Sequence, residues 1–152
     1  MQSLLGEYEA TVDAKGRFLL PAGLRKQLGE GASSFIMNRG FEKCLTLYPM
    51  SSWEPIVKQI SGLNQFDPKV REFRRQFLAG ATEVDLDTAG RMLLPSTLKE
   101  FAELGKDIIL VGALDKVEIW DAAKYKKFFD QPNPEAFARL AAEVMTNPGI
   151  NL

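Results

Sequence analysis

The sequence predicts an α+β protein built from two tandem copies of one β-α-β-β-α unit. The main observation is an internal repeat, since residues 13–21 read DAKGRFLLP and residues 87–95 read DTAGRMLLP. Apolar positions also alternate in some segments, as in half-buried strands, and recur at helical spacing in others. With 152 residues, the chain is long enough for one core that both copies share.

The repeat continues on both sides of this loop. Residues matched at an offset of 74 precede it and residues matched at an offset of 72 follow it: Gly6 with Gly80, Glu9 with Glu83, Gly40 with Gly112, Tyr48 with Trp120, and Trp53 with Tyr125. We therefore predict a first unit at residues 5–62, a linker helix at 63–79, a second unit at 80–130, and a C-terminal helix and tail at 131–152.

The first unit opens with a predicted strand at Glu7–Val12, where apolar and polar residues alternate. The turn that follows contains Gly16, which adopts a positive φ at little cost. Residues 17–20 return as a second strand, and we expect this strand pair to close around the turn. Pro21 suits the first position of a helix, and Gly29 marks the end of that helix.

Two more strands are predicted at residues 35–37 and 44–48, followed by a helix that Ser51 or Ser52 caps. The second unit repeats this order. Its strands are predicted at residues 82–86, 91–94, 108–111 and 117–120, and its helices begin at Pro95 and Asp121.

Two helical segments lie outside the repeat. Pro68 opens the linker helix, and Pro134, capped by Asn133, opens a tail helix that ends at residues 146–149. The linker helix has a basic face made of Lys69, Arg71, Arg74 and Arg75. We interpret this face as solvated, with contacts to phosphate or to a neighbouring subunit as alternatives. Helical phenylalanines are interpreted as core rather than as a base-stacking platform: Phe73, Phe77, Phe101, Phe128, Phe129 and Phe137.

The composition argues against an enzyme. The chain contains no histidine, which is the commonest general base and metal ligand, and Cys44 is its only cysteine. Ser-His and Cys-His nucleophile pairs are therefore excluded. Catalysis by carboxylates alone stays open, but no Gly-rich phosphate loop and no Cys-x-x-Cys pair is present. We expect no catalytic residue, no metal and no cofactor.

The single cysteine also indicates a reducing compartment, since no internal disulfide is possible. Cys44 lies in an apolar run and is expected to be buried. No apolar stretch approaches the roughly 20 residues of a membrane span, and no basic segment precedes an apolar run near residue 1. We expect a cytoplasmic protein with no membrane partner.

The repeated loop is the candidate site. Asp13 either accepts hydrogen bonds from the turn amides or pairs with Arg17 across the turn. The recurrence of this pair as Asp87 and Arg91 fits a binding role and equally fits an element that the duplicated fold needs. Lys15 and Arg17 form a compact cationic tip, and the arginine fork suits phosphate and guanine edges.

Charge is unevenly distributed between the copies. The net charge is −1, but residues 1–79 carry eleven Lys and Arg against eight Asp and Glu, whereas residues 80–152 carry eight against twelve. The second loop has Ala89 where the first has a lysine, and Glu83 and Asp85 precede it. We therefore expect the two loops to bind unequally.

At these residues the chain resembles the MraZ family, whose members consist of two SpoVT-AbrB-type units. The resemblance covers about residues 4–130. It rests on these segments: Gly6–Glu9, Asp13–Arg17, Leu20–Pro21, Arg39–Phe41, Cys44–Pro49, Trp53, Phe73–Arg75, Gly80–Glu83, Asp87, Gly90–Arg91, Leu94–Pro95 and Ile119–Trp120.

The resemblance implies that the two AbrB-like units of one chain pair into one swapped-hairpin β-barrel with flanking helices. It also implies a homo-oligomeric ring that binds double-stranded DNA. The family acts on short direct repeats upstream of the division and cell-wall gene cluster and regulates its transcription. The protein is then expected to be cytoplasmic and nucleoid-associated.

The family's functional motif, Asp-x-x-x-Arg, matches Asp13 and Arg17 in the first copy and Asp87 and Arg91 in the second. The resemblance assigns DNA contact to the basic residues of the loop, which are Lys15 and Arg17 in the first copy. Arg91 is the corresponding candidate in the second copy, and the two aspartates are candidates for positioning the arginines.

Two alternatives remain. AbrB-like units also serve as antitoxin-like or scaffold modules that bind other proteins. Tandem copies without a long disordered tail favour the DNA-binding regulator over that alternative. Barrels of related build occur in small decarboxylases, but we find no glycine-serine pair placed for self-processing, so that alternative rests on fold analogy alone.

Overall fold

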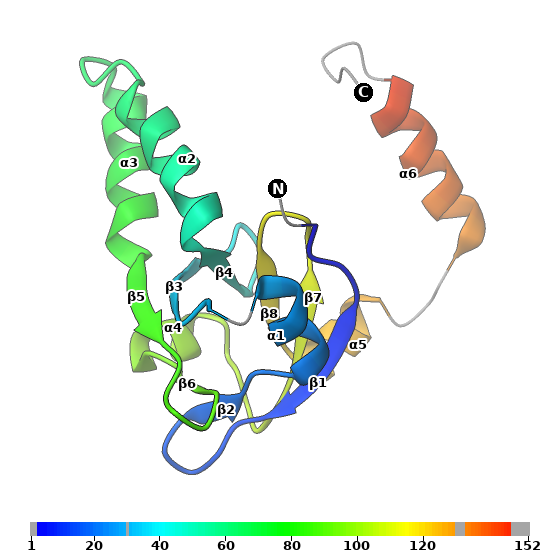
Figure 1. The fold of residues 1–152 in the computed structure, drawn as a ribbon. Helices are drawn as coiled ribbons and strands as arrows, with labels where there is room; N and C mark the ends of the chain where they lie inside the picture. The colour runs from blue at the N-terminus through cyan, green and yellow to red at the C-terminus, as the bar shows by residue number, and fades with distance from the viewer. Residues whose placement is uncertain (1–2, 30, 130–132, 147–152) are drawn as a thin grey trace.

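The strands form a six-stranded antiparallel sheet and a separate two-stranded ribbon (Figure 1). This computed structural model describes residues 3–29, 31–129 and 133–146. The strands are β1 (Glu7–Thr11), β2 (Arg17–Leu19), β3 (Ser34–Arg39), β4 (Leu45–Pro49), β5 (Thr82–Asp85), β6 (Arg91–Leu93), β7 (Asp107–Gly112) and β8 (Val117–Asp121). The helices are α1 (Ala22–Leu28), α2 (Met50–Ser61), α3 (Pro68–Gly80), α4 (Ser96–Phe101), α5 (Ala122–Phe128) and α6 (Pro134–Thr146).

The two copies exchange their first strands. The large sheet has the order β1-β7-β8-β4-β3-β5, so β1 of the first copy lies beside β7 of the second, and β5 of the second lies beside β3 of the first. In these ladders Glu9 is opposite Ile109 and Phe35 is opposite Val84. Each copy therefore completes the sheet of the other, and neither forms a complete sheet alone.

We predicted that the first two strands of each copy pair with each other, and this prediction is wrong. Only one isolated bridge, Val12 to Phe18, joins the first strand to the second, and β2 instead pairs with β6 of the other copy. The reason lies in the core, because Phe18 and Met92 are directly opposite in the β2–β6 ribbon and are both fully buried. Each copy thus runs β-β-α-β-β-α, with its first two strands in different sheets.

A closed barrel is not confirmed. The ladders of the large sheet stop at β1 on one side and at β5 on the other. Isolated bridges, Val12 to Phe18 and Leu86 to Met92, are the links between this sheet and the ribbon. The α+β class and the tandem units are confirmed. The sheet does not close into a barrel, because among the described residues only these single bridges join it to the ribbon.

One apolar core joins the two copies. Its members include Leu24 and Phe35 from the first copy and Leu98 and Leu110 from the second, each at most 3% exposed. Cys44 is fully buried, as predicted, and belongs to a smaller cluster with Trp120. A shared core explains why two short units form one stable body.

Prolines set the starts of several helices. Pro21 and Pro95 lie one residue before α1 and α4 rather than at their first position. The predicted serine caps of α2 are wrong, because Pro49 ends β4 and the helix begins at Met50, which places Ser51 inside it. Other predictions are local and are confirmed. Gly29 ends α1 with a φ of 97°, Asp121 caps α5, and Pro68 opens α3 after Asp67.

The linker helix packs against the first copy. Phe77 of α3 stacks on Trp53 of α2 with ring centroids 5.7 Å apart, and Trp53 in turn contacts Tyr48 of β4. The interpretation of the other phenylalanines as core is wrong in part. Phe128 and Phe129 are 65% and 53% exposed, because the short helix α5 buries one residue, Tyr125.

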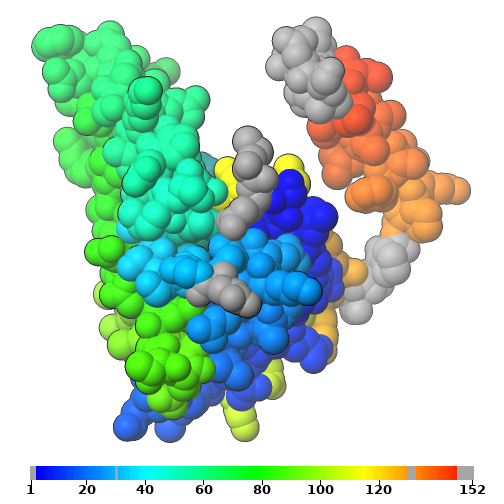
Figure 2. All heavy atoms as spheres, viewed as in Figure 1, coloured from blue at the N-terminus to red at the C-terminus, as the bar shows by residue number. Residues whose placement is uncertain are grey.

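Helix α6 is exposed along its whole length. Asn133 accepts a hydrogen bond from the Ala136 amide at 3.1 Å, which confirms the predicted cap. None of its residues from 134 to 146 is buried, and Phe137 is 73% exposed rather than in the core. The space-filling view shows α6 standing apart from the body (Figure 2). Of the predicted end of this helix at residues 146–149, Thr146 is the last residue of α6, and residues 147–149 lie outside the described residues.

The described helices are too short or too polar for any of them to cross a membrane.

Gly112 tests the contact between the first copy and β7. A Cβ at this position would lie 2.4 Å from the Leu5 nitrogen and 2.6 Å from the Leu4 carbonyl carbon. Because backbone must shift to admit it, we expect Gly112→Ala to lower the free energy of unfolding by about 1–3 kcal/mol. Gly31→Ala is the control, since no described atom lies within 4 Å of its Cβ position. Equal urea midpoints for the two variants would contradict the proposed close contact.

Candidate functional site

The first loop is organised by one carboxylate. Oδ1 of Asp13 accepts hydrogen bonds from the backbone amides of Lys15 and Arg17, both at 2.9 Å. Its Oδ2 accepts from Nε of Arg17 at 3.0 Å. Gly16 has a φ of 83° and closes the turn by donating its amide to the Asp13 carbonyl. The sequence left two roles open for Asp13, which were hydrogen bonds to the turn amides and an ion pair with Arg17. The structure shows both together.

The second loop has the same geometry. Asp87 accepts from the amides of Ala89 and Arg91 at 2.9 and 2.8 Å, and from Nε of Arg91 at 3.0 Å. Gly90 takes a φ of 84°. The backbone and the ion pair are therefore equivalent in the two copies, and the difference between the loops lies in their other side chains.

The loops are joined to each other through the backbone. The Leu94 amide donates to the Gly16 carbonyl at 2.9 Å, and the Leu20 amide donates to the Gly90 carbonyl at 3.1 Å. Each loop tip thus lies against the strand that leaves the other loop. The structure brings both Asp-x-x-x-Arg motifs to one end of the molecule, where β2 and β6 meet (Figure 1).

The ribbon has one buried face and one outward face. Phe18 and Met92 fill the buried face, so their neighbours in each strand point the other way. The outward pairs are Arg17 opposite Leu93 and Leu19 opposite Arg91. Two arginines therefore lie diagonally across one face, each beside a leucine.

Leu19 and Leu93 are site residues that sequence reasoning missed. They are 57% and 55% exposed, although they lie in short apolar strand segments. Successive side chains of a strand point to opposite faces, so the burial of Phe18 would have placed its neighbour Leu19 on the outward face.

Hydrogen bonding keeps both loop carboxylates charged. The Arg17 backbone amide, together with the Arg17 side chain and the Lys15 amide, holds the pKa of Asp13 below its usual value. The Arg91 amide has the same effect on the pKa of Asp87, aided by the Ala89 amide. Charged aspartates at neutral pH hold both guanidinium groups in place.

The surroundings of the two loops differ in charge. Lys15 is exposed at the tip of the first loop, and a hollow of about 610 Å³ beside Asp13 is lined by Lys99 and Lys106. The second loop carries Ala89 at its tip. The Ser34 hydroxyl donates to Asp85 near that loop, so this carboxylate is engaged outside the Arg91 ion pair.

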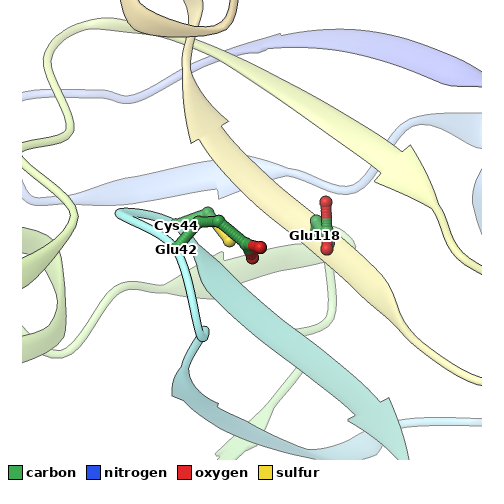
Figure 3. Close-up of side chains that lie close together, drawn as sticks. All are labelled: Glu42, Cys44 and Glu118. Carbon is green, nitrogen blue, oxygen red and sulfur yellow. The ribbon is translucent and has the colours of Figure 1, made fainter. Parts of the chain in front are cut away.

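Glu42, Cys44 and Glu118 form a cluster of metal-ligating types far from the loops in sequence (Figure 3). Burial, with the Glu118 and Glu42 carboxylates adding to it, raises the pKa of the Cys44 thiol to about 12. Glu118 also accepts a hydrogen bond from Trp120 Nε1 at 3.0 Å. Because exposed acidic groups often lie close together without a metal, and Glu118 already bonds to Trp120, we assign no metal to this cluster.

Comparison with known proteins identifies relatives along nearly the whole chain. A family model described as "MraZ protein, putative antitoxin-like" matches residues 3–76 and again residues 77–147. A protein named "Transcriptional regulator MraZ" from Christiangramia forsetii is 44% identical, over 97% of this chain and 96% of its own length. Proteins of the same name from Cytophaga hutchinsonii and Desulfitobacterium hafniense are 44% and 42% identical, over 92% and 96% of this chain and 93% and 99% of their own lengths.

The loop carboxylates predict a specific pH dependence of stability. Their pKa is lower in the folded state than in the unfolded state, so their contribution is complete above the unfolded pKa of about 3.9 and is lost as pH falls through the folded pKa. We expect the double variant Asp13→Asn, Asp87→Asn to lose less stability than the native protein below about pH 4. Thermal unfolding across this range measures the difference in stability, with a variant of the exposed Asp107, Asp107→Asn, as control. Parallel pH curves for the native protein and the double variant would contradict the assignment.

Proposed function

The chain belongs to the MraZ family, and we propose that it is a sequence-specific DNA-binding regulator of transcription. Two successive matches to one family model cover both copies of the repeat. Relatives that align with almost the whole chain carry the name transcriptional regulator. These names support a regulatory role, and the geometry of the β2–β6 ribbon supports a way of contacting DNA.

The outward face of the ribbon is the observation that supports DNA binding most directly. The major groove of B-DNA admits a two-stranded β-ribbon. Arg17 and Arg91 lie on this face, and an arginine fork donates two parallel hydrogen bonds to guanine or to phosphate. Their aspartates bond to the Nε atoms, so the terminal Nη atoms are not taken up by these ion pairs. Asp13 and Asp87 act as positioning residues.

The first loop is the stronger contact in this proposal. Lys15 adds a second cation beside Arg17, and Lys99 and Lys106 lie beside the same loop. Each cation near DNA displaces counterions from the phosphates and so contributes affinity that does not depend on sequence. The second loop, with Ala89 at its tip, has less positive charge of its own.

The DNA target in this proposal is a set of short direct repeats upstream of the division and cell-wall gene cluster. A single subunit carries a net charge of −1 and a small cationic end, so it neutralises few phosphates. A ring of subunits on repeated boxes makes later contacts intramolecular, with avidity gains of roughly 10²–10⁴. The protein then acts in the cytoplasm, associated with the nucleoid.

Helix α6 supports an oligomer. A helix of 13 residues is marginal in water unless it packs against another surface. Its apolar side chains are all more than a third exposed: Phe137, Leu140, Val144 and Met145. Exposed apolar stripes of this kind mark interfaces, and head-to-tail contacts between copies close into rings when the rotation permits.

The same apolar stripe is the observation that favours the alternative function. An antitoxin-like or scaffold module uses such a helix to bind a different protein, in line with the description of the family model. The two functions differ in what α6 contacts and in whether the ribbon binds DNA.

Replacing the loop arginines tests the proposed DNA face. Arg17→Ala should weaken binding to a duplex from the protein's own upstream region by about 1–3 kcal/mol per lost base contact, while the unfolding midpoint changes little. Arg91→Ala should weaken it less. Arg75→Ala on the exposed face of α3 is the control in a fluorescence anisotropy titration. Unchanged affinity for Arg17→Ala would reject the ribbon face as the DNA contact. A loss for Arg91→Ala that equals or exceeds the loss for Arg17→Ala would reject the stronger role of the first loop. A comparable loss for Arg75→Ala would indicate that the basic face of α3 binds DNA instead.

A second experiment tests the dependence on assembly. Leu140→Asp should dissociate the oligomer in light scattering and weaken binding to DNA that carries several boxes, because avidity is lost. Ala142→Asp adds the same charge on the opposite side of α6 and should leave both unchanged. Native protein should also bind one box far more weakly than several. A monomeric native protein, or equal affinity for one box and several, favours the antitoxin-like module.

A further inference from the structure

Arg25 of the first copy lies on the loop of the second copy. Its guanidinium Nη1 is 2.4 Å from the position that a Cβ would take at Gly90, and Leu19 Cδ1 is 3.7 Å from the same position. The side chain of Arg25 is exposed. An arginine from α1 therefore covers the tip of the second Asp-x-x-x-Arg loop.

Strand exchange explains how this contact arises. The Leu20 amide donates to the Gly90 carbonyl, so the chain that leaves β2 passes directly beside the second loop. Pro21 immediately precedes α1 at this point, and Arg25 follows on the exposed side of the helix. The cation reaches the second loop because its own strand pairs there.

The other copy repeats the relation with a different residue. Lys99 of α4 matches Arg25 at the offset of 74 that relates the two loops. It lines the hollow beside the first loop, together with Asp13 and Ala14. Each loop thus has a cation from the first helix of the opposite copy at its side.

We propose that Arg25 supplies the second loop with the phosphate-binding cation that Ala89 does not provide. The inference rests on the proposed DNA-binding function and adds a contact to the DNA backbone. The first loop has its own tip lysine, Lys15, whereas the second has an alanine at the matching position. Arg25, lying against the neighbouring Gly90, places positive charge at that same tip.

The chemistry of Arg25 favours phosphate over an internal acidic partner. Among the described ion pairs none includes Arg25, whereas Arg17 and Arg91 are each held by an aspartate. An exposed guanidinium that pairs with no carboxylate of the described residues is suited to bidentate hydrogen bonding with phosphate. It lies at the side of the ribbon, and phosphates flank the groove that a ribbon occupies.

Gly90 is required for this arrangement in two ways. Its φ of 84° is in the left-handed region that side chains rarely adopt. Its lack of a Cβ also leaves the space in which the Arg25 guanidinium lies. A side chain at this position would displace the cation as well as strain the turn.

The test compares Arg25→Gln with Lys26→Gln, which removes an exposed cation from the next residue of the same helix. Anisotropy titrations use the upstream duplex and a scrambled duplex of equal length at several salt concentrations. A lost phosphate contact lowers the slope of log affinity against log salt by about 0.9 for each engaged subunit. The affinity ratio of native protein to Arg25→Gln should therefore shrink by about 3.5-fold for each engaged subunit between 50 and 200 mM salt. Both duplexes should show this effect, and Lys26→Gln should show none of it.

A rescue variant separates charge from structure. Ala89→Lys places a lysine where the first loop has one, so adding it to Arg25→Gln should restore most of the affinity and the native salt slope. Three results would each overturn the inference. Arg25→Gln could keep the native salt slope, Lys26→Gln could lose as much affinity as Arg25→Gln, or Ala89→Lys could fail to restore the affinity that Arg25→Gln loses. If the native protein binds neither duplex, the proposed DNA-binding function itself fails. If it binds the upstream duplex and Arg25→Gln binds it equally well, the inference about Arg25 alone fails.

Discussion

Backbone pairing between the two copies is the constraint on which the rest of the structure depends. A buried strand must satisfy its amides and carbonyls, and here the partners come from the other copy. β1 pairs with β7 and β5 with β3, and the loop carbonyls of Gly16 and Gly90 accept from amides of the opposite copy. Contacts such as Glu7 to Val111 join distant parts of the chain, so folding must close long loops before it gains these ladders. The units fold together because the first two strands of each copy have their ladder partners in the other copy.

Local features of the fold could be predicted from the sequence, whereas strand partners could not. Gly16, Gly29 and Asp121 act through their own backbone geometry or through amides nearby, so a short stretch of sequence contains the signal. Alternating apolar residues indicate which face of a strand is buried, but they do not indicate which strand lies beside it. β2 therefore had an obvious neighbour in sequence, and the burial of Phe18 against Met92 selected a different one.

The candidate site shows the same division. The Asp13–Arg17 pair was predictable because both residues belong to one turn. The outward position of Leu19 follows from its alternation with the buried Phe18. The approach of Arg25 to Gly90 depends on strand exchange, so no local pattern revealed it. The core assignment of Phe128 failed because helical periodicity identifies an apolar face but does not show whether anything covers it.

A ribbon whose two strands belong to one chain need not be symmetric. When two identical chains each contribute a strand, the ribbon has an exact twofold axis, and its DNA site is palindromic in consequence. Here the backbone keeps that symmetry, while the side chains break it: Lys15 corresponds to Ala89, and Arg25 corresponds to Lys99. Such a ribbon has polarity. Under the proposed DNA-binding function, a site that fits this ribbon has a defined orientation on the DNA, and neighbouring subunits that face the same way would require sites in tandem rather than inverted.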